Sequence, residues 1–257
     1  MAPPDIVVAP SAAHLADDVV ARLVGTLSQA QRQRGRAALA LTAGAIMERV
    51  WTALAGSAVA ADAINWAAVD VCWGDERFVP ANSPDRNDLP AERILFSRPP
   101  FAAATRHRMP ASDGTYGADL DAAAAGYADE LRLARRADDH DEVPNFDVVL
   151  LGIGSDGHCC SLFADHPSVH DESASVIAVR NSPKPPPLRI SLSFDGLNAA
   201  NEIWVVASGE GKAQACARAL GGADRVQVPS AGARGRHRTL WLLDADAAGL
   251  LGSAPIT

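Results

Sequence analysis

The segment that decides the fold is FDVVLLGIGSDGHCCSLF, residues 146–163 of the 257-residue chain. Its first part, from Phe146 to Ile153, is short, rich in branched aliphatic residues and without polar alternation. This pattern is typical of a strand that is covered on both faces in a parallel sheet. Three glycines then allow a sharp turn and a close approach of the backbone to a ligand. Because ligands bind at the carboxyl ends of strands in open α/β sheets, the segment predicts a site as well as a strand.

Strand-like and helix-like segments alternate on both sides of this central strand. The other apolar runs that we interpret as strands are residues 6–8, 37–41, 69–73, 176–179, 203–207 and 239–243. Helices are expected after the N-cap Ser11, after Ala45, between Tyr116 and Arg136, from Glu210 to Leu220, and after Asp244. The alternation predicts one α/β domain over residues 1–257, a doubly wound, mostly parallel, Rossmann-like sheet with helices on both faces.

The composition indicates an ordinary globular protein, with 48% hydrophobic and 21% charged residues. A formal net charge of −8 argues against nucleic acid as a partner, so a phosphorylated ligand would need a local basic pocket. Four cysteines, including the adjacent pair Cys159 and Cys160, suggest reduced thiols rather than a disulfide framework. No apolar stretch reaches the roughly 18 residues of a membrane helix. We therefore expect a cytoplasmic protein without a membrane partner.

The glycine loop after the central strand carries an acid and a histidine, Asp156 and His158. An imidazole beside a carboxylate can exchange a proton near neutral pH, which indicates acid–base chemistry. The spacing GIGSDG at 152–157 also satisfies a dinucleotide fingerprint, but the crossover helix and the acid that ends a second strand are missing. A zinc site using His158, Cys159, Cys160, His166 and His170 is disfavoured because the spacing fits no tetrahedral motif. We expect neither a metal nor a cofactor.

Cationic and small residues follow several of the other strands. The turn from Thr42 through Gly44 leads directly into a helix, whose free amide groups favour an anion, although small residues there also allow close packing. Arg77 follows the strand 69–73, and a guanidinium suits bidentate phosphate binding. Lys184 stands among four prolines, which indicates a rigid site loop in preference to a linker. Lys212 in the first turn of a helix opposes the helix dipole, as expected if an anion uses its charge.

Three ordered blocks resemble the signature blocks of the 6-phosphogluconolactonase family, in the wider superfamily of glucosamine-6-phosphate deaminase. They are WGDERFVP at 73–80, GIGSDGH at 152–158 followed by SLF, and SPKPPP at 182–187 followed by Arg189 and Ile190. The resemblance spans nearly the whole chain. It implies hydrolysis of 6-phospho-D-glucono-1,5-lactone to 6-phosphogluconate in the oxidative pentose phosphate pathway, without a cofactor. The first loop departs from the family's usual Ser-Gly-Gly-Ser/Thr-Pro, because TAGAI stands at 42–46.

The resemblance also implies a set of roles. His158 is expected to be the general base, Asp156 to orient it or bind sugar hydroxyls, and the amides of the loop from Gly154 to Gly157 to stabilise the oxyanion. The phosphate grip is assigned to Arg77, Lys184 and the turn of Thr42 and Gly44, with Arg189 and Lys212 as further candidates. Asp75 and Asn87 are expected to hold hydroxyls or to fix their loop. The partner implied is a phosphorylated sugar lactone, bound by a monomer or a small homo-oligomer.

Two rival functions remain from the sequence. The first is a sugar-phosphate isomerase or deaminase in which Asp75 is the carbon base and His158 opens the ring; the Lys184 and Arg77 blocks favour the lactonase instead. The second is a non-catalytic sugar-phosphate sensor of the kind fused to DNA-binding domains. We disfavour the sensor because the first expected strand begins almost at the start of the sequence.

Overall fold

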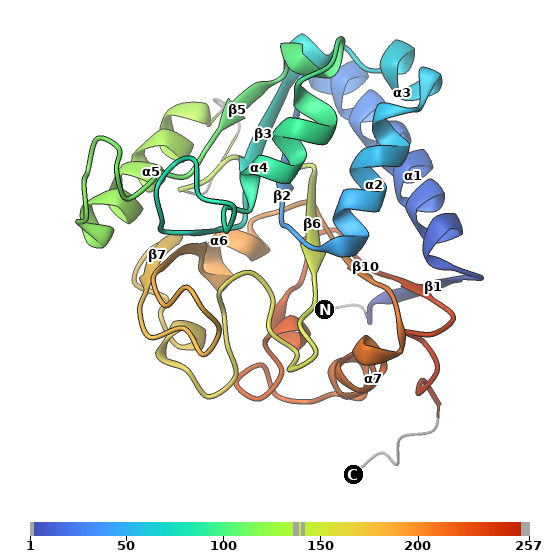
Figure 1. Ribbon diagram of the computed structural model, residues 1–257. Coiled ribbons are helices and arrows are strands. Elements are labelled where there is room, and N and C mark those ends of the chain that lie inside the picture. Colours follow the sequence, from blue (N-terminus) through green and yellow to red (C-terminus); the bar gives the residue numbers. More distant parts are fainter. Residues whose placement is uncertain (1–2, 136–138, 140–141, 253–257) are drawn as a thin grey trace.

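The computed structural model describes residues 3–135, 139 and 142–252, and its core is a seven-stranded parallel sheet (Figure 1). The strand order is β1-β10-β9-β6-β2-β3-β5. The strands are β1 (Asp5–Ala9), β2 (Ala37–Leu41), β3 (Val69–Trp73), β5 (Thr105–His107), β6 (Val148–Gly152), β9 (Glu202–Ala207) and β10 (Arg238–Asp244). The expected parallel sheet is therefore confirmed, and the chain reverses its winding direction between β6 and β2.

Helices cover the sheet on both sides, with α1, α2 and α3 gathered on one side and α5 on the other (Figure 1). The α-helices are α1 (Ala12–Arg34), α2 (Ala45–Ala55), α3 (Ala58–Ala63), α4 (Asp88–Ala91), α5 (Leu120–Ala134), α6 (Phe194–Asn198) and α7 (Ala213–Leu220). Short helical turns are η1 (Trp66–Ala68), η2 (Glu92–Phe96), η3 (Phe101–Ala103), η4 (Pro167–Val169), η5 (Glu210–Lys212) and η6 (Pro229–Gly232). No helix in the described part of the chain is long and apolar enough to cross a membrane.

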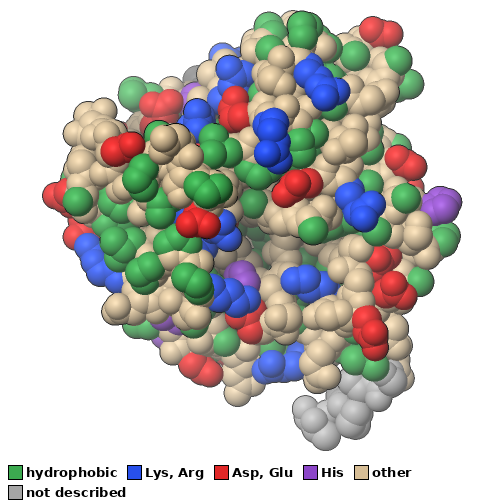
Figure 2. Space-filling view, viewed as in Figure 1, with side chains coloured by type: hydrophobic (Ala, Val, Ile, Leu, Met, Phe, Trp, Pro, Cys, Tyr) green, Lys and Arg blue, Asp and Glu red, His purple; other side chains and the backbone are tan. Residues whose placement is uncertain are grey.

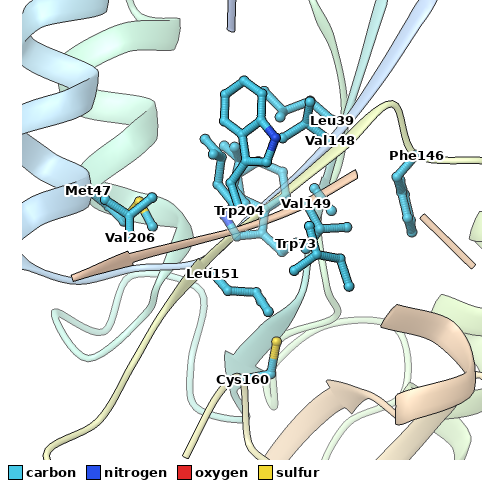
Figure 3. Close-up of a cluster of buried hydrophobic side chains, with 14 of the residues drawn as sticks. Leu39, Met47, Trp73, Phe146, Val148, Val149, Leu151, Cys160, Trp204 and Val206 are labelled. Atoms are coloured by element: carbon cyan, nitrogen blue, oxygen red, sulfur yellow. The ribbon is translucent and has the colours of Figure 1, made fainter. Parts of the chain in front are cut away.

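The central strand β6 lies between β2 and β9 and is buried on both faces. Trp73 and Trp204 pack around its apolar side chains with Met47 of α2 (Figure 3). Polar alternation would place every second side chain in this apolar layer without a hydrogen-bond partner, which explains the uninterrupted run from Val148 to Leu151.

The first helix shows why the local sequence signals were reliable. The Ser11 hydroxyl accepts a hydrogen bond from the amide of His14 and caps α1, and Gly35 ends the helix at φ 76°. Beyond this end, Arg34 and Arg36 pair with Asp147 and Asp70 at the amino ends of β6 and β3. These arginines lie at the end of the sheet opposite to the carboxyl ends and so away from the expected site.

A second sheet of three antiparallel strands was not expected from the sequence. It has the order β4-β8-β7, with β4 (Asp75–Arg77), β8 (Arg189–Leu192) and β7 (Val176–Val179). Gly74 joins the two sheets because it lies between the end of β3 and the start of β4. A Cβ there would lie 2.9 Å from Cys160 Sγ, which disfavours a side chain at this position. No strand was expected at residues 75–77, since a three-residue charged strand becomes visible only through its partner β8, more than 100 residues away.

Two helix predictions also need correction. The helix expected between Tyr116 and Arg136 begins at Leu120 with Asp119 as its N-cap, and Arg136 lies outside the described residues. The helix expected after Asp244 is a series of turns in the described residues up to 252. The Asp244 carboxylate accepts hydrogen bonds from the amides of Ala247 and Gly209, so it closes a turn and holds the loop after β9.

His107 of β5 contributes a pH-dependent term to stability. Its Nε2 lies 3.4 Å from Asp70 Oδ1 and its Nδ1 2.7 Å from Glu130 Oε1. The hydrogen bond to Asp70, with that to Glu130, raises the pKa of His107 although burial acts in the opposite direction. The stabilisation is fully present below the ordinary pKa of 6.5 and is lost as the pH rises through the raised folded value.

We therefore expect the stability of wild type and His107→Gln to converge as the pH rises. In urea unfolding, the wild type should have the larger free energy of unfolding at about pH 6, and its advantage should shrink by about pH 9. An advantage that stayed constant over this range would contradict the assignment of a charged His107.

Candidate active site

A cavity of about 720 Å³ opens at the carboxyl ends of the central strands. Among the described residues, its lining includes six Arg or Lys residues (Arg49, Arg77, Arg86, Lys184, Arg189 and Lys212) but only two carboxylates, Glu48 and Asp75. Blue cationic side chains surround the hollow in the middle of the face shown in Figure 2. In a chain of net charge −8, this local excess of positive charge favours an anionic ligand.

The structure brings ten of the twelve candidate residues to this cavity. They are Thr42, Gly44, Asp75, Arg77, Asn87, Gly154, His158, Lys184, Arg189 and Lys212. Asp156 and Gly157 are not among the lining residues, but they belong to the same loop as His158, and Asp156 contacts that histidine. The candidates come from five separate parts of the sequence, and the parallel sheet brings them together at the carboxyl ends of its strands.

Asp156, His158 and Lys184 form a compact triangle. Asp156 Oδ1 lies 2.5 Å from His158 Nδ1, and Lys184 Nζ lies 3.0 Å from Asp156 Oδ2 and 3.1 Å from His158 Nδ1. Partial burial acts to raise the pKa of Asp156, but the hydrogen bonds and charges of His158 and Lys184 outweigh it and hold that pKa well below its usual value. An ionised carboxylate only accepts, so Nδ1 donates to it and Nε2 is left to take up a proton.

The glycines of this loop make the close approach possible. A Cβ on Gly154 would collide with the ring of His158 and with the carboxylate of Asp156. Gly157 adopts φ 88°, and a Cβ there would lie 2.7 Å from Val228 Cγ1. Both positions therefore exclude a side chain.

The same loop corrects one detail of the expected oxyanion site. The Gly154 amide donates to the carbonyl of His158 and the Gly157 amide to that of Gly154, both at 2.9 Å. Neither amide is free for a ligand. The Ser155 amide makes no hydrogen bond within the described residues, and Ser155 lines the cavity, so it is the better candidate for an oxyanion donor.

Gly154→Ala should abolish most activity without unfolding the protein. The new methyl group must displace the ring of His158 or the carboxylate of Asp156, and either movement breaks the pair. We expect kcat to fall about 100-fold or more, as for loss of a general base. Gly25→Ala is the matched control, because Gly25 lies in the middle of α1 with open space around its Cα. This control should keep full activity and become slightly more stable.

The turn at the start of α2 offers backbone groups rather than its hydroxyl. Thr42 Oγ1 donates to the carbonyl of Leu150 at 3.0 Å and accepts from the amide of Gly152 at 2.9 Å, which ties β2 to β6. Gly44 is the N-cap of α2 at φ 141° and supplies no side-chain cap. The first amides of α2 thus remain open at the cavity, where the positive end of the helix dipole favours an anion.

The last residue of β4 and the loop that follows it present Arg77 and Asn87. Arg77 donates from Nη1 to the carbonyl of Asp85 at 2.6 Å, whereas its buried Nε has no hydrogen-bond partner among the residues that the structure describes. Asn87 Nδ2 donates to the carbonyl of Asp75 at 3.0 Å and approaches Asp75 Oδ1 at 3.3 Å. Asp75 also accepts from Ser161 Oγ at 2.8 Å. Asn87 and Asp75 therefore hold each other in place. This agrees with the expectation that they fix their loop.

Sequence reasoning missed the residues that hold this loop. The carboxylate of Glu76 is 1% exposed and accepts the amides of Arg77 at 2.7 Å, Asn87 at 2.6 Å and Asp88 at 3.0 Å. Burial, opposed by Arg86, raises the pKa of Glu76 to about 7. Arg86 lines the cavity and pairs with Asp88 at 2.8 Å. The only signal was the density of charges after Trp73, which usually indicates a solvated loop.

The two lysines in the sequence, Lys184 and Lys212, both line the cavity. Burial, with the nearby charge of Lys184, lowers the pKa of Lys212. Arg189 is 3% exposed, and its Nε and Nη2 donate to backbone carbonyls of the loop that carries Lys184. Its expected role as a phosphate ligand therefore rests on Nη1 alone.

Fold and site define an α/β protein with a histidine–carboxylate contact beside a cavity that is rich in cations and lies at the carboxyl ends of the strands. The family model described as glucosamine-6-phosphate isomerases/6-phosphogluconolactonase matches residues 10–241, and the chain belongs to this family. Among its relatives, the 6-phosphogluconolactonase of Streptomyces coelicolor is 49% identical over 248 residues, 96% of this chain and 95% of the relative. The 6-phosphogluconolactonase of Mycobacterium tuberculosis is 47% identical over 232 residues, which are 90% of this chain and 92% of the relative.

Solved structures agree with this assignment. The 6-phosphogluconolactonase from Trypanosoma brucei superposes with a TM-score of 0.82 at 26% identity, over 97% of this chain and 99% of that one. A monomeric glucosamine-6-phosphate deaminase superposes with a TM-score of 0.72 at 16% identity, over 96% and 99%. The second likeness concerns the fold alone.

Proposed function

We propose that this protein hydrolyses 6-phospho-D-glucono-1,5-lactone to 6-phospho-D-gluconate, a step of the oxidative pentose phosphate pathway. The observation that carries the proposal is the contact between Asp156 and His158 in a cavity lined by cations. The relatives named 6-phosphogluconolactonase support it. The proposal includes no cofactor, a cytoplasmic location, and a monomer or small homo-oligomer.

In this mechanism His158 is the general base. Its Nε2 takes a proton from a water molecule, and the water oxygen forms a bond to the lactone carbonyl carbon. The oxyanion that develops accepts hydrogen bonds from the Ser155 amide and from the ammonium of Lys184. When the intermediate collapses, the bond between the carbonyl carbon and the ring oxygen breaks, and protonated His158 returns its proton to that oxygen. The products are a carboxylate and a hydroxyl, with one proton released to solvent.

Asp156 acts by keeping His158 in the required tautomer. Its carboxylate accepts from Nδ1 and stabilises the imidazolium that forms after proton uptake. The Lys184 ammonium, at 3.0 Å from Asp156, keeps the carboxylate ionised and in place. The phosphate is assigned to Arg77, Lys212 and the amino end of α2, which supply donors without complete protein pairing.

The proposal is tested by following proton release from freshly generated phosphorylated lactone. We expect a rate far above spontaneous hydrolysis, a much smaller effect on unphosphorylated gluconolactone, and no change on addition of a chelator. No acceleration would overturn the proposal. Release of ammonia from glucosamine 6-phosphate would then support the isomerase or deaminase alternative, in which Asp75 acts on carbon.

A further inference from the structure

The loop at residues 182–187 holds Lys184 in place without a helix or a strand. The Ser182 amide donates to the carbonyl of Pro187 at 3.0 Å, and the Ser182 hydroxyl donates to the carbonyl of Lys184 at 2.8 Å. Four of the six residues are prolines and have no N–H group. The loop therefore has few donors of its own, and the carbonyls of its prolines need partners from elsewhere.

Arg189 supplies a partner for two of the four proline carbonyls and for the carbonyl of Lys184. Its Nε donates to the carbonyl of Pro186 at 2.8 Å, and its Nη2 donates to those of Lys184 at 2.9 Å and Pro185 at 3.1 Å. The side chain is buried at the start of β8 and forms no ion pair with a carboxylate within the described residues. A buried guanidinium thus uses its fork of donors on three consecutive carbonyls.

A second contact links the same guanidinium to the histidine. The Arg189 guanidinium lies 5.9 Å from the centroid of the Phe163 ring, and the Phe163 ring lies 4.9 Å from that of His158. Arg189 therefore contacts the backbone of Lys184 by hydrogen bonds and is linked to His158 through the ring of Phe163, which packs between them.

We propose that Arg189 is a positioning residue of the lactonase: its guanidinium fixes the backbone of residues 184–186 so that the Lys184 ammonium stays beside Asp156 and His158. The proposal rests on the function proposed above. It gives Arg189 a role through Lys184 in place of direct phosphate binding. A lysine at this position keeps the charge but loses the fork, so it cannot hold three carbonyls.

A double-mutant cycle tests the coupling. Arg189→Lys should lower kcat about 10- to 100-fold, with a smaller change in KM for the phosphorylated lactone. In the Lys184→Ala background the same change should cost less than about 2-fold, because the group that it positions is gone. Equal losses in both backgrounds, or a rise in KM alone, would overturn the proposal. Arg180→Met, an exposed change at the end of β7, is the control and should retain the wild-type rate.

A second measurement is independent of activity. Reductive methylation with ¹³C-formaldehyde labels two lysine side chains, Lys184 and Lys212, whose signals are assigned with Lys184→Ala. Arg189→Met should move the Lys184 signal toward that of a free dimethyl-lysine and leave the Lys212 signal in place. An unmoved Lys184 signal in the folded variant would contradict the proposal. If the wild type shows no lactonase activity, the proposed function fails, and this measurement still decides whether Arg189 positions Lys184.

Discussion

His158→Ala should reduce kcat for hydrolysis of the phosphorylated lactone by about 10²- to 10⁴-fold, the usual contribution of a general base. The lactone carbonyl is electrophilic, but neutral water attacks it slowly unless a base removes a proton as the bond forms. Within the triangle, Nε2 of His158 is the only nitrogen left free to do so, because Nδ1 faces Asp156 and Lys184 is an ammonium. KM should change little, since the phosphate contacts lie on other loops.

The control for this variant is His170→Ala, which removes an exposed imidazole from the neighbouring turn. It should keep the wild-type kcat. Thermal unfolding of both variants checks that each is folded, and steady-state kinetics give kcat and KM separately. A folded His158→Ala variant with the wild-type kcat would exclude His158 as the base.

Arg77→Met should raise KM for the phosphorylated lactone by about 10- to 100-fold, as expected for losing charged hydrogen bonds to a phosphate. The side chain lines the cavity, Nη1 is held by the carbonyl of Asp85, and within the described part of the chain the buried Nε has no hydrogen-bond partner. This arrangement orients the guanidinium and leaves donors for the ligand. Glu76 binds the backbone amide of Arg77 and not its side chain, so the loop should persist in the variant.

The readout that separates a phosphate contact from general damage is selectivity. Arg77→Met should lose most of the preference for phosphorylated over unphosphorylated lactone, with kcat/KM for the unphosphorylated compound nearly unchanged. Arg98→Met, which removes an exposed arginine beyond η2, should keep the full preference. Equal losses for both lactones in Arg77→Met would show that the guanidinium does not contact the phosphate.

Much of the parallel sheet could be predicted because its signals are local. A buried parallel strand is uniformly apolar, as in β6, and a helix announces itself by its cap and spacing, as with Ser11 and α1. The small antiparallel sheet could not be predicted in this way. All three residues of its strand β4 are of charged types, and only their pairing with the distant β8 makes them a strand.

Similar reasons apply to the site. The glycine loop showed that Asp156 and His158 are near each other, because they are two residues apart. That Lys184 completes the contact was not visible, since the segment between His158 and Lys184 contains β7, which pairs with β8 in the small sheet and not with the glycine loop. The amides of Gly154 and Gly157 were expected to donate hydrogen bonds to the ligand, but both donate to carbonyls within the turn itself.

The sequence by itself determined the α/β class, the strand that carries the site, and the residue types that the chemistry needs. These follow from periodicity, backbone freedom and side-chain chemistry, which act within a few residues. Only the tertiary structure decided which polar groups can bind a ligand and which already form hydrogen bonds within the protein. The side chains of Thr42, Glu76 and Arg189 form hydrogen bonds with backbone groups of other segments. For Thr42 that segment is distant in the sequence, and for Glu76 and Arg189 it is a nearby loop that folds back onto the side chain. Burial requires each such atom to find a partner, and the fold alone supplies the partner.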